Sequence, residues 1–344
     1  MAPVKPTDGP VAVTGANGYI GSWNVHELVE HGYHVHACMR DTRNPVKVSH
    51  LLEMNNKGLR GQVTLKQGDL TDPGSYDDAF AGCVAVMHTG TPMPSGDTAQ
   101  QDVYDGCFTQ IDHVLESARK AGTVKRFLYT SSLAAVIFPA PDDYVFTETD
   151  WCGDEGEDYV SAYRGMFPPG RMVAYSMGKA NAERKLYRYA EVGKSFDAVS
   201  IIPALVAGPI MCQDHDKHFQ RSVKKMLMGL PIVGRHMCIV DVRDVAQAHR
   251  LGIESSVAGT GSRYIIGAAD DSGILYTPQL QEKMKALFPQ FENIGGESDR
   301  KMNNYERCYS TLAKQELGLT QYSVDETIRA TGDSYIALGL VEGA

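Results

Sequence analysis

Short apolar runs alternate with amphipathic segments along the first two thirds of the chain. The apolar runs predict strands, and the segments between them, such as "SWNVHELVEHG" at 22–32, predict helices. Strands that alternate with helices indicate crossover units and a parallel sheet covered on both faces. The predicted strands are 11–15, 33–40, 63–70, 83–90, 126–132 and 197–209.

The alternation breaks down after Pro209 into helices, loops and weak strands. We therefore expect an α/β fold, a Rossmann-type doubly wound parallel sheet with a smaller C-terminal substrate lobe. Residues 1–209 would form the dinucleotide-binding domain, with 137–172 contributing to the substrate pocket. Residues 210–344 would form mainly the lobe, with some return to the first domain.

A long helix is predicted over "AYSMGKANAERKLYRYAEV" (174–192), which is rich in Ala, Glu, Lys, Arg and Leu and lacks proline. Tyr175 and Lys179 lie four residues apart and so share one face of this helix. A nearby ammonium group favours the phenolate, so we expect Lys179 to lower the pKa of Tyr175 and make it a usable proton donor. Taken alone, the pair is much more typical of an exposed helix surface than of a catalytic site.

A glycine-rich loop lies between the first predicted strand and the first helix, in "VTGANGYIGSW". Its G-x-x-G-x-x-G spacing permits a tight turn and brings backbone amides close to a pyrophosphate at a helix N-terminus. The strand-turn-helix context predicts dinucleotide binding. The expected contacts are Gly15, Asn17, Gly18, Tyr19, Ile20 and Gly21.

The end of the second strand bears on which dinucleotide is bound. NAD-binding proteins usually place an acid there for the ribose 2′-hydroxyl, whereas this strand ends in Met39 and Arg40. Arg40 suits a 2′-phosphate through charge-assisted hydrogen bonds, and Asp41 comes one residue late. NADPH is the expected cofactor, and a solvated loop charge is the alternative for Arg40.

Hydroxyl groups follow the fifth strand in "YTSSLAAV", at the end where ligands bind. Ser132 could hydrogen-bond a carbonyl oxygen poised over a nicotinamide ring. For Ser131 we expect a turn that caps its own backbone.

The glycine loop and the Ser132-Tyr175-Lys179 set together resemble the extended short-chain dehydrogenase/reductases. More narrowly, the chain is similar to the branch of dihydroflavonol reductases, cinnamoyl-CoA reductases and fungal aldehyde reductases, from Val11 to about Leu340. Four further segments support the resemblance: "MRDTRNPVKVSHL" with Lys47, "GDL" with Asp69 and Leu70, "HTGTPM" with Gly90 and Thr91, and "IIPALVAGP" with Pro203 and Val206.

This resemblance implies roles for the matching residues. Tyr175 would be the general acid toward the carbonyl oxygen, and Ser132 would orient and polarise that carbonyl. Lys179 would lower the pKa of the tyrosine and hold the nicotinamide ribose, and Lys47 would be a second phosphate contact. The implied activity is an NADPH-dependent reduction of a hydrophobic, aromatic aldehyde, ketone or thioester.

Several positions depart from individual members of the branch. Dihydroflavonol reductases carry a flavonoid-gripping Asn where this chain has Ile137. Cinnamoyl-CoA reductases have Asn-Trp before the tyrosine and Cys-Tyr after it, where Val173, Ala174, Ser176 and Met177 stand here. A nucleotide-sugar epimerase or dehydratase, a 3β-hydroxysteroid dehydrogenase and a non-enzymatic NADP-sensing protein remain as alternatives.

Composition and charge restrict the partners. A formal charge of -9 without a long basic run argues against nucleic acid, and no apolar stretch reaches the ~18 residues of a membrane span. The first ten residues are expected to form a short disordered lead without a signal peptide. Seven scattered cysteines without a CxxC motif are typical of reduced thiols in a cytoplasmic protein. We expect a monomer or a homodimer.

No metal is expected. "CQDHDKHF" places Asp214, His215, Asp216 and His218 close together, but their spacing matches no known ligand motif. Phe167, Met172, Met226 and Met228 could line an apolar pocket or equally pack in the core.

Overall fold

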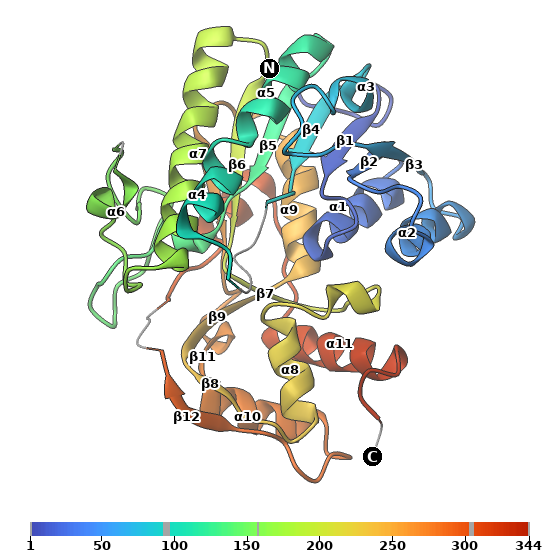
Figure 1. Cartoon of the computed structure of the whole chain (residues 1–344). Coiled ribbons are helices and arrows are strands. Elements are labelled where there is room, and N and C mark those ends of the chain that lie inside the picture. The colour runs from blue at the N-terminus through green and yellow to red at the C-terminus, as the bar shows by residue number, and fades with distance from the viewer. Residues whose placement is uncertain (1, 92–96, 157, 303–305, 343–344) are drawn as a thin grey trace.

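The computed structural model describes residues 2–91, 97–156, 158–302 and 306–342. Its main feature is a parallel sheet of seven strands in the order β10-β6-β5-β4-β1-β2-β3 (Figure 1). The strands are β1 (Val11–Thr14), β2 (His34–Met39), β3 (Gln62–Gln67), β4 (Ala85–His88), β5 (Arg126–Thr130), β6 (Asp197–Pro203) and β10 (Ser262–Ile266). The strand order reverses between β1 and β4, which is the crevice where ligands bind in such sheets.

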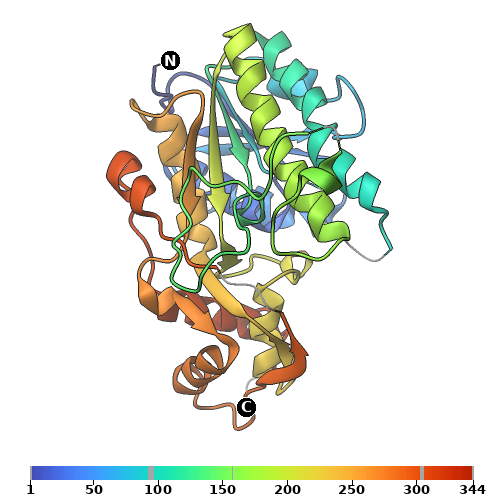
Figure 2. The same ribbon diagram turned by 90° about the vertical axis from the view of Figure 1, so that its left-hand side faces the viewer.

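Helices cover both faces of this sheet, as Figure 2 shows with α9 on one side and α4, α5 and α7 on the other. On one face the core is completed by α1 (Tyr19–Glu30) and α9 (Val242–Glu254). On the other face it is completed by α3 (Asp77–Phe80), α5 (Ile111–Ala121) and α7 (Arg171–Gly193), with α4 (Gln100–Phe108) packed on α7. The doubly wound fold predicted from the apolar pattern is confirmed. The remaining helices of this part are α2 (Pro45–Leu52) and α6 (Tyr159–Ala162).

A smaller lobe lies below the carboxyl ends of the strands and has a hydrophobic core of its own (Figure 1). Its strands form two small sheets, β11-β9-β7 and β12-β8. The strands are β7 (Leu205–Ala207), β8 (Ile232–Gly234), β9 (His236–Asp241), β11 (Ile274–Tyr276) and β12 (Glu297–Lys301), and the helices are α8 (Gln220–Leu227), α10 (Thr277–Leu287) and α11 (Val324–Ala337).

The predicted strand 197–209 is two strands in the structure. The Ala204 amide donates to Ile266 O (2.9 Å), and there the chain leaves the large sheet. β7 then pairs with β9 of the lobe. One apolar run thus joins the two parts, and its pattern alone could not show the break because both halves are apolar.

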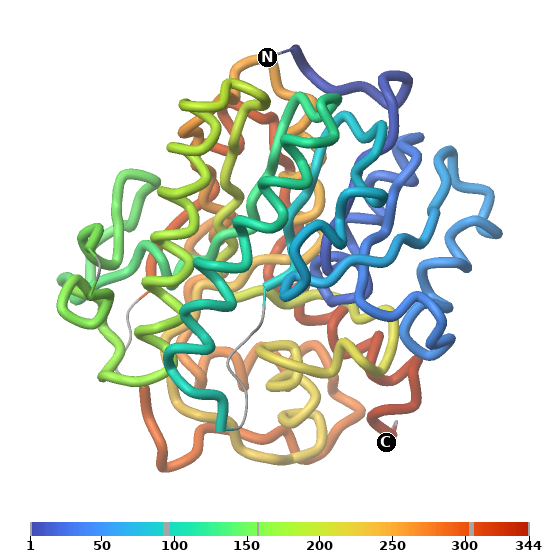
Figure 3. Tube along the Cα trace, turned by 45° about the horizontal axis from the view of Figure 1, so that its top comes forward, coloured from blue at the N-terminus to red at the C-terminus, as the bar shows by residue number. Residues whose placement is uncertain are grey.

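Two elements after Pro209 return to the large sheet. β10 pairs with β6 at its edge, and α9 packs on α1. The N-terminal stretch lies beside the end of α9, as Figure 3 shows. Val4 is fully buried there, and its amide donates to Ile253 O (2.9 Å). The expectation of a disordered lead was therefore wrong at Val4, because an apolar side chain finds a site against α9.

Candidate active site

A cavity of about 800 Å³ lies between the carboxyl ends of the strands and the lobe. Most of the residues singled out in the sequence line it, although they come from seven separate segments. Lys47 is an exception, since it is exposed on α2 and does not line the cavity. Pro92 and Met93, at the end of "HTGTPM", lie outside the described residues. The lining residues from the sequence prediction are Gly15, Asn17, Gly18, Tyr19, Ile20, Gly21, Arg40, Asp69, Leu70, Gly90, Thr91, Ser132, Tyr175, Lys179, Pro203 and Val206.

The glycine loop is packed too tightly for side chains. Gly15 has φ +62°, and a Cβ built on it would lie 2.7 Å from the Cα of Gly90. A Cβ on Gly21 would collide with the carbonyl oxygen of Gly15. The backbones at Gly15, Gly21 and Gly90 therefore lie in direct contact. Because these residues carry no side chains, the surface of the loop stays open to a ligand.

The N-terminus of α1 faces this surface. Gly18 is its N-cap, no side chain caps the helix in the described part of the chain, and the first turn holds no acid. The first amides of a helix lack intrahelical acceptors, and the helix dipole favours negative charge there. The loop therefore fits the pyrophosphate of a dinucleotide.

Arg40 follows β2 directly and lines the cavity from an exposed position. Among the described residues no carboxylate pairs with it. Asp41 does not line the cavity, and its carboxylate accepts from the Arg43 amide (3.0 Å). At the end of β2 the charge that faces the cavity is therefore positive, which suits a phosphate.

Lys179 is the buried cation of the site, only 2% exposed. Its ammonium group donates to Thr91 Oγ1 (2.7 Å) and to Thr130 O (2.8 Å) and lies 4.8 Å from the centre of the Tyr129 ring. Burial lowers the pKa of Lys179 to about 8, because a charged amine loses its hydration there.

Tyr175 lies one turn before Lys179 on α7, and its hydroxyl is in hydrogen-bond contact with Ser132. Burial raises the pKa of Tyr175, the nearby Cys107 side chain adds to this effect, and the bond to Ser132 opposes it. The expected lowering by Lys179 was therefore wrong: loss of hydration dominates, and the ammonium group is directed to Thr91 and Thr130. A neutral phenol is nevertheless the form that can donate a proton.

The turn after β5 is capped by a different serine from the one predicted from the sequence. Ser132, not Ser131, caps the following turn, with its Oγ accepting from the Ala134 amide (3.2 Å). Ser131 is buried and donates to Glu183 (2.8 Å), which in turn pairs with Arg263 (2.7 Å). The cap leaves Ser132 facing the cavity beside Tyr175.

The lobe end of the cavity is mostly apolar. Of the four candidates for an apolar pocket, Phe167 and Met172 line the cavity. Met226 is buried in the lobe core, and Met228 is 53% exposed elsewhere. Leu133, Ala134 and Ile137 complete the apolar wall.

The far wall of the cavity is formed by polar residues of the lobe, which no sequence motif had indicated. Arg235 pairs with Glu306 (3.3 Å) across 71 residues of chain. Gln220 and His218 lie nearby on the same cavity. Of these residues, only His218 was singled out in the sequence, within the polar loop 212–219. The positions of the others depend on how the lobe folds.

These features are those of one class of protein, a dinucleotide-dependent oxidoreductase. Comparison with known proteins identifies the family within this class. The sequence model of the NAD dependent epimerase/dehydratase family matches residues 11–267. The chain belongs to this family, and the predicted resemblance to the reductase branch of the extended short-chain dehydrogenases/reductases is confirmed.

Several plant reductases are similar over most of the chain. A putative anthocyanidin reductase of Ginkgo biloba is 34% identical over 310 residues, covering 85% of each protein. A bifunctional dihydroflavonol 4-reductase/flavanone 4-reductase of Pyrus communis is 36% identical over 336 residues, covering 96% of this chain and 92% of the relative.

Solved structures agree in fold. Vestitone reductase from alfalfa matches with a TM-score of 0.73 and 25% identity, covering 96% of this chain and 99% of that one. A yeast methylglyoxal/isovaleraldehyde reductase in complex with NADPH matches with a TM-score of 0.78 and 23% identity over 96% and 99% of the two chains. Within the described residues, no helix is both long and apolar enough to cross a membrane.

Proposed function

We propose that the protein reduces the carbonyl group of a hydrophobic, aromatic aldehyde, ketone or thioester with NADPH. One observation carries this proposal. A single cavity has the glycine loop and Arg40 at one end, an apolar wall at the other, and Ser132, Tyr175 and Lys179 between them. A cofactor and a flat apolar substrate could therefore meet beside the acid.

The bound dinucleotide supplies the hydride. The protein supplies the proton: the phenol of Tyr175 donates to the carbonyl oxygen as negative charge develops there. The Ser132 hydroxyl, held beside Tyr175, donates a second hydrogen bond to the same oxygen and so polarises the carbonyl. An aldehyde or ketone gives an alcohol, whereas a thioester gives a hemithioacetal that breaks down to an aldehyde and a free thiol. In each case Tyr175 is left as phenolate.

Lys179 can restore the proton and stabilise the phenolate. A pKa of about 8 allows the ammonium group to exist at neutral pH and to give up a proton without a large barrier. Its bonds to Thr91 and Thr130 O fix the amine at the junction of β4, β5 and α7. Positive charge there also suits the ribose hydroxyls of a dinucleotide.

Two features support an aromatic substrate. The wall made by Leu133, Ile137, Phe167 and Met172 offers apolar contact without a charge. The relatives from Ginkgo biloba and Pyrus communis carry the names of flavonoid reductases. Ile137 cannot donate or accept a hydrogen bond, so a flavonoid would need a different polar contact, for which Arg235 is placed on the same cavity.

A panel of aromatic aldehydes, ketones and acyl-CoA thioesters, followed by NADPH absorbance, tests the proposal. We expect turnover of at least one aromatic carbonyl and none of nucleotide sugars. Tightly retained NAD with activity on a nucleotide sugar would establish an epimerase or dehydratase instead. Binding of NADPH without turnover of any carbonyl would establish a dinucleotide sensor.

A further inference from the structure

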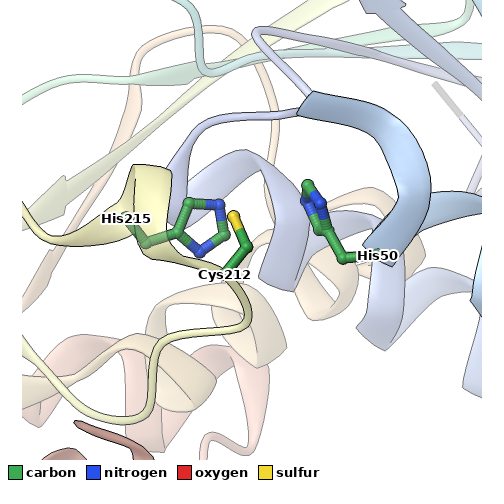
Figure 4. Close-up of side chains that lie close together, drawn as sticks. All are labelled: His50, Cys212 and His215. Carbon is green, nitrogen blue, oxygen red and sulfur yellow. The ribbon is translucent and has the colours of Figure 1, made fainter. Parts of the chain in front are cut away.

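Three potential metal ligands meet outside the cavity. His50 comes from α2, whereas Cys212 and His215 flank the short 3-10 helix Gln213–His215 at the start of the lobe (Figure 4). One nitrogen of each imidazole and the Cys212 sulfur lie within 4.8 Å of one another. The sequence groups His215 only with its neighbours Asp214, Asp216 and His218, because nothing in it links residue 50 to residue 215.

The three donor atoms suit one kind of metal. Two imidazole nitrogens and one cysteine sulfur, bound as thiolate, form a donor set typical of Zn²⁺.

His50 also has an unmet lone pair. The Ser22 hydroxyl donates to Ala16 O (3.0 Å), so at its contact with His50 Nε2 (2.9 Å) it acts as acceptor. His50 then carries its proton on Nε2, and Nδ1 has a lone pair. That nitrogen is buried and has no hydrogen-bond partner among the residues that the structure describes, in a side chain only 7% exposed. A Lewis acid satisfies such a lone pair, while the bond from Nε2–H to Ser22 orients the ring as in known zinc sites.

We propose that His50, Cys212 and His215 bind one zinc-type divalent cation, with water as the fourth ligand. Binding forms one metal–sulfur and two metal–nitrogen bonds, and the Cys212 thiol loses its proton to solvent. At His215 the metal replaces the hydrogen bond that Nδ1 accepts from the Met211 amide (3.3 Å). Tetrahedral ligands at zinc distances lie about 3.5 Å apart, so the three groups need to contract by about 1 Å. All seven cysteines lie in the described part of the chain, and Cys212, unlike the other six, is partly exposed, which gives a cation access.

The cation would connect three parts of the molecule. It would join α2 of the large domain to the loop that begins the lobe. The glycine loop is also in contact, because His215 Nε2 lies 3.3 Å from Asn17 O and from Ser22 Oγ. The three ligands themselves do not line the cavity, so the cation would stabilise the arrangement and take no part in catalysis.

Other groups of potential ligands are less suitable. Glu27, Glu30 and His31 also lie close together, but they are partly or fully exposed, and Glu27 is paired with Arg250 (2.7 Å). Cys83 and His36 are in contact (3.3 Å) and buried, yet no third ligand joins them among the described residues. Cys83 therefore provides a matched control.

Cobalt(II) chloride titrated into the full-length chain, freed of metal by chelation, tests the proposal. We expect one equivalent to bind with a thiolate-to-cobalt absorption band that zinc chloride displaces. Cys212→Ser should abolish the band, and Cys83→Ser should keep it. His50→Gln should weaken binding by more than the roughly 10–100-fold that loss of an outer-shell partner costs. Zinc at 100 times its Kd should raise the melting temperature by about 3–6 °C in the wild type only.

A second measurement uses the wild type alone, in case a variant fails to fold. Zinc should protect Cys212 from alkylation by iodoacetamide, as located by peptide mass spectrometry. Absence of a stoichiometric band in the wild type, a band that persists in Cys212→Ser, or alkylation of Cys212 unaffected by zinc would each overturn the proposal.

Discussion

The two ends of the cavity are built in different ways. The dinucleotide end consists of one compact loop, Gly15 to Gly21, joined by residues that directly follow the other strands. The lobe end gathers side chains as far apart as Ile137 and Glu306, from loops and from several elements of the lobe. A binding surface made of backbone and strand ends depends on local turn geometry, whereas a surface made of distant side chains depends on the packing of the whole lobe.

The difference has a functional consequence. Backbone amides and strand ends offer the same geometry to any dinucleotide, so this end is suited to a fixed cofactor. The lobe end can change with single side chains and leave the sheet undisturbed, which suits a variable substrate. Substitutions at the dinucleotide end and the catalytic junction should therefore alter catalysis or cofactor use, and those at the lobe end should alter only substrate use.

The largest effect is expected for Tyr175→Phe, at the junction of the two ends. The change removes the transferable proton and little else, so kcat should fall by about 10² or more while the Kd for NADPH is unchanged. Steady-state kinetics and NADPH fluorescence titration measure the two quantities. Tyr159→Phe, the same change on a ring stacked on Tyr104 outside the cavity, is the control and should be neutral. Near-normal turnover of Tyr175→Phe would refute the assignment of the acid.

Lys179→Ala should lower both kcat, by about tenfold or more, and the affinity for NADPH, because the ammonium group is assigned two roles. In the wild type, kcat/KM for reduction should fall as pH rises through about 8. Burial holds the pKa of Lys179 at about 8, so its positive charge is present below that pH and lost above it.

Lys185→Ala is the matched control on the same helix. Its ammonium group pairs with Asp112 (2.8 Å) away from the cavity, and its removal should leave both the rate and the pH profile unchanged. A pH profile of the wild type that stays flat through pH 9 would mean that Lys179 does not supply the titrating charge.

Arg40→Ala should mainly change cofactor choice. A charge-assisted hydrogen bond contributes about 1.5–3 kcal/mol, and 1.4 kcal/mol is tenfold in affinity. The wild type should therefore prefer NADPH to NADH by at least about tenfold in kcat/KM, and the variant should lose most of this through KM for NADPH. Arg43→Ala, an exposed arginine that does not line the cavity, should retain the preference. Equal use of both cofactors by the wild type would refute the role of Arg40.

The dinucleotide end was predictable because its determinants are local in sequence. The spacing of Gly15, Gly18 and Gly21 and the apolar strand before them suffice to indicate the turn. Two detailed predictions about this region were wrong, each for a physical reason. The pKa of Tyr175 depends on burial, which helix spacing does not reveal, and the different partners of Ser131 and Ser132 depend on Glu183, 52 residues from Ser131.

The lobe end was not predictable from the sequence. Arg235 and Glu306 meet only because β8 and β9 place Arg235 opposite a late loop. Met172 and Met228 looked equivalent in the sequence, yet one lines the cavity and the other faces solvent. The meeting of His50 with Cys212 and His215 likewise follows from the docking of the lobe on α2.

Met172 and Met228 allow a direct test of whether the lobe end of the cavity binds the substrate. Met172→Ala should lower kcat/KM for an aromatic carbonyl by at least about fourfold. The change removes two carbon groups and the sulfur, and burial of a single methylene is already worth about 0.8 kcal/mol. KM for NADPH should not change. Met228→Ala removes the same side chain outside the cavity and should be neutral. Equal losses in the two variants would show that Met172 acts on stability and not on substrate binding.

The smallest effect is expected for metal removal. Polarisation of the carbonyl is assigned to Ser132 and Tyr175, and none of the proposed zinc ligands lines the cavity. Exhaustive dialysis against EDTA should therefore leave kcat for an aromatic carbonyl unchanged at 25 °C. Cys212→Ser treated in parallel is the control, and it should have the same rate with or without the chelator. Activity lost to EDTA in the wild type and restored by zinc would mean that a cation at His50, Cys212 and His215 governs the glycine loop, so that the two ends of the molecule are coupled rather than separable.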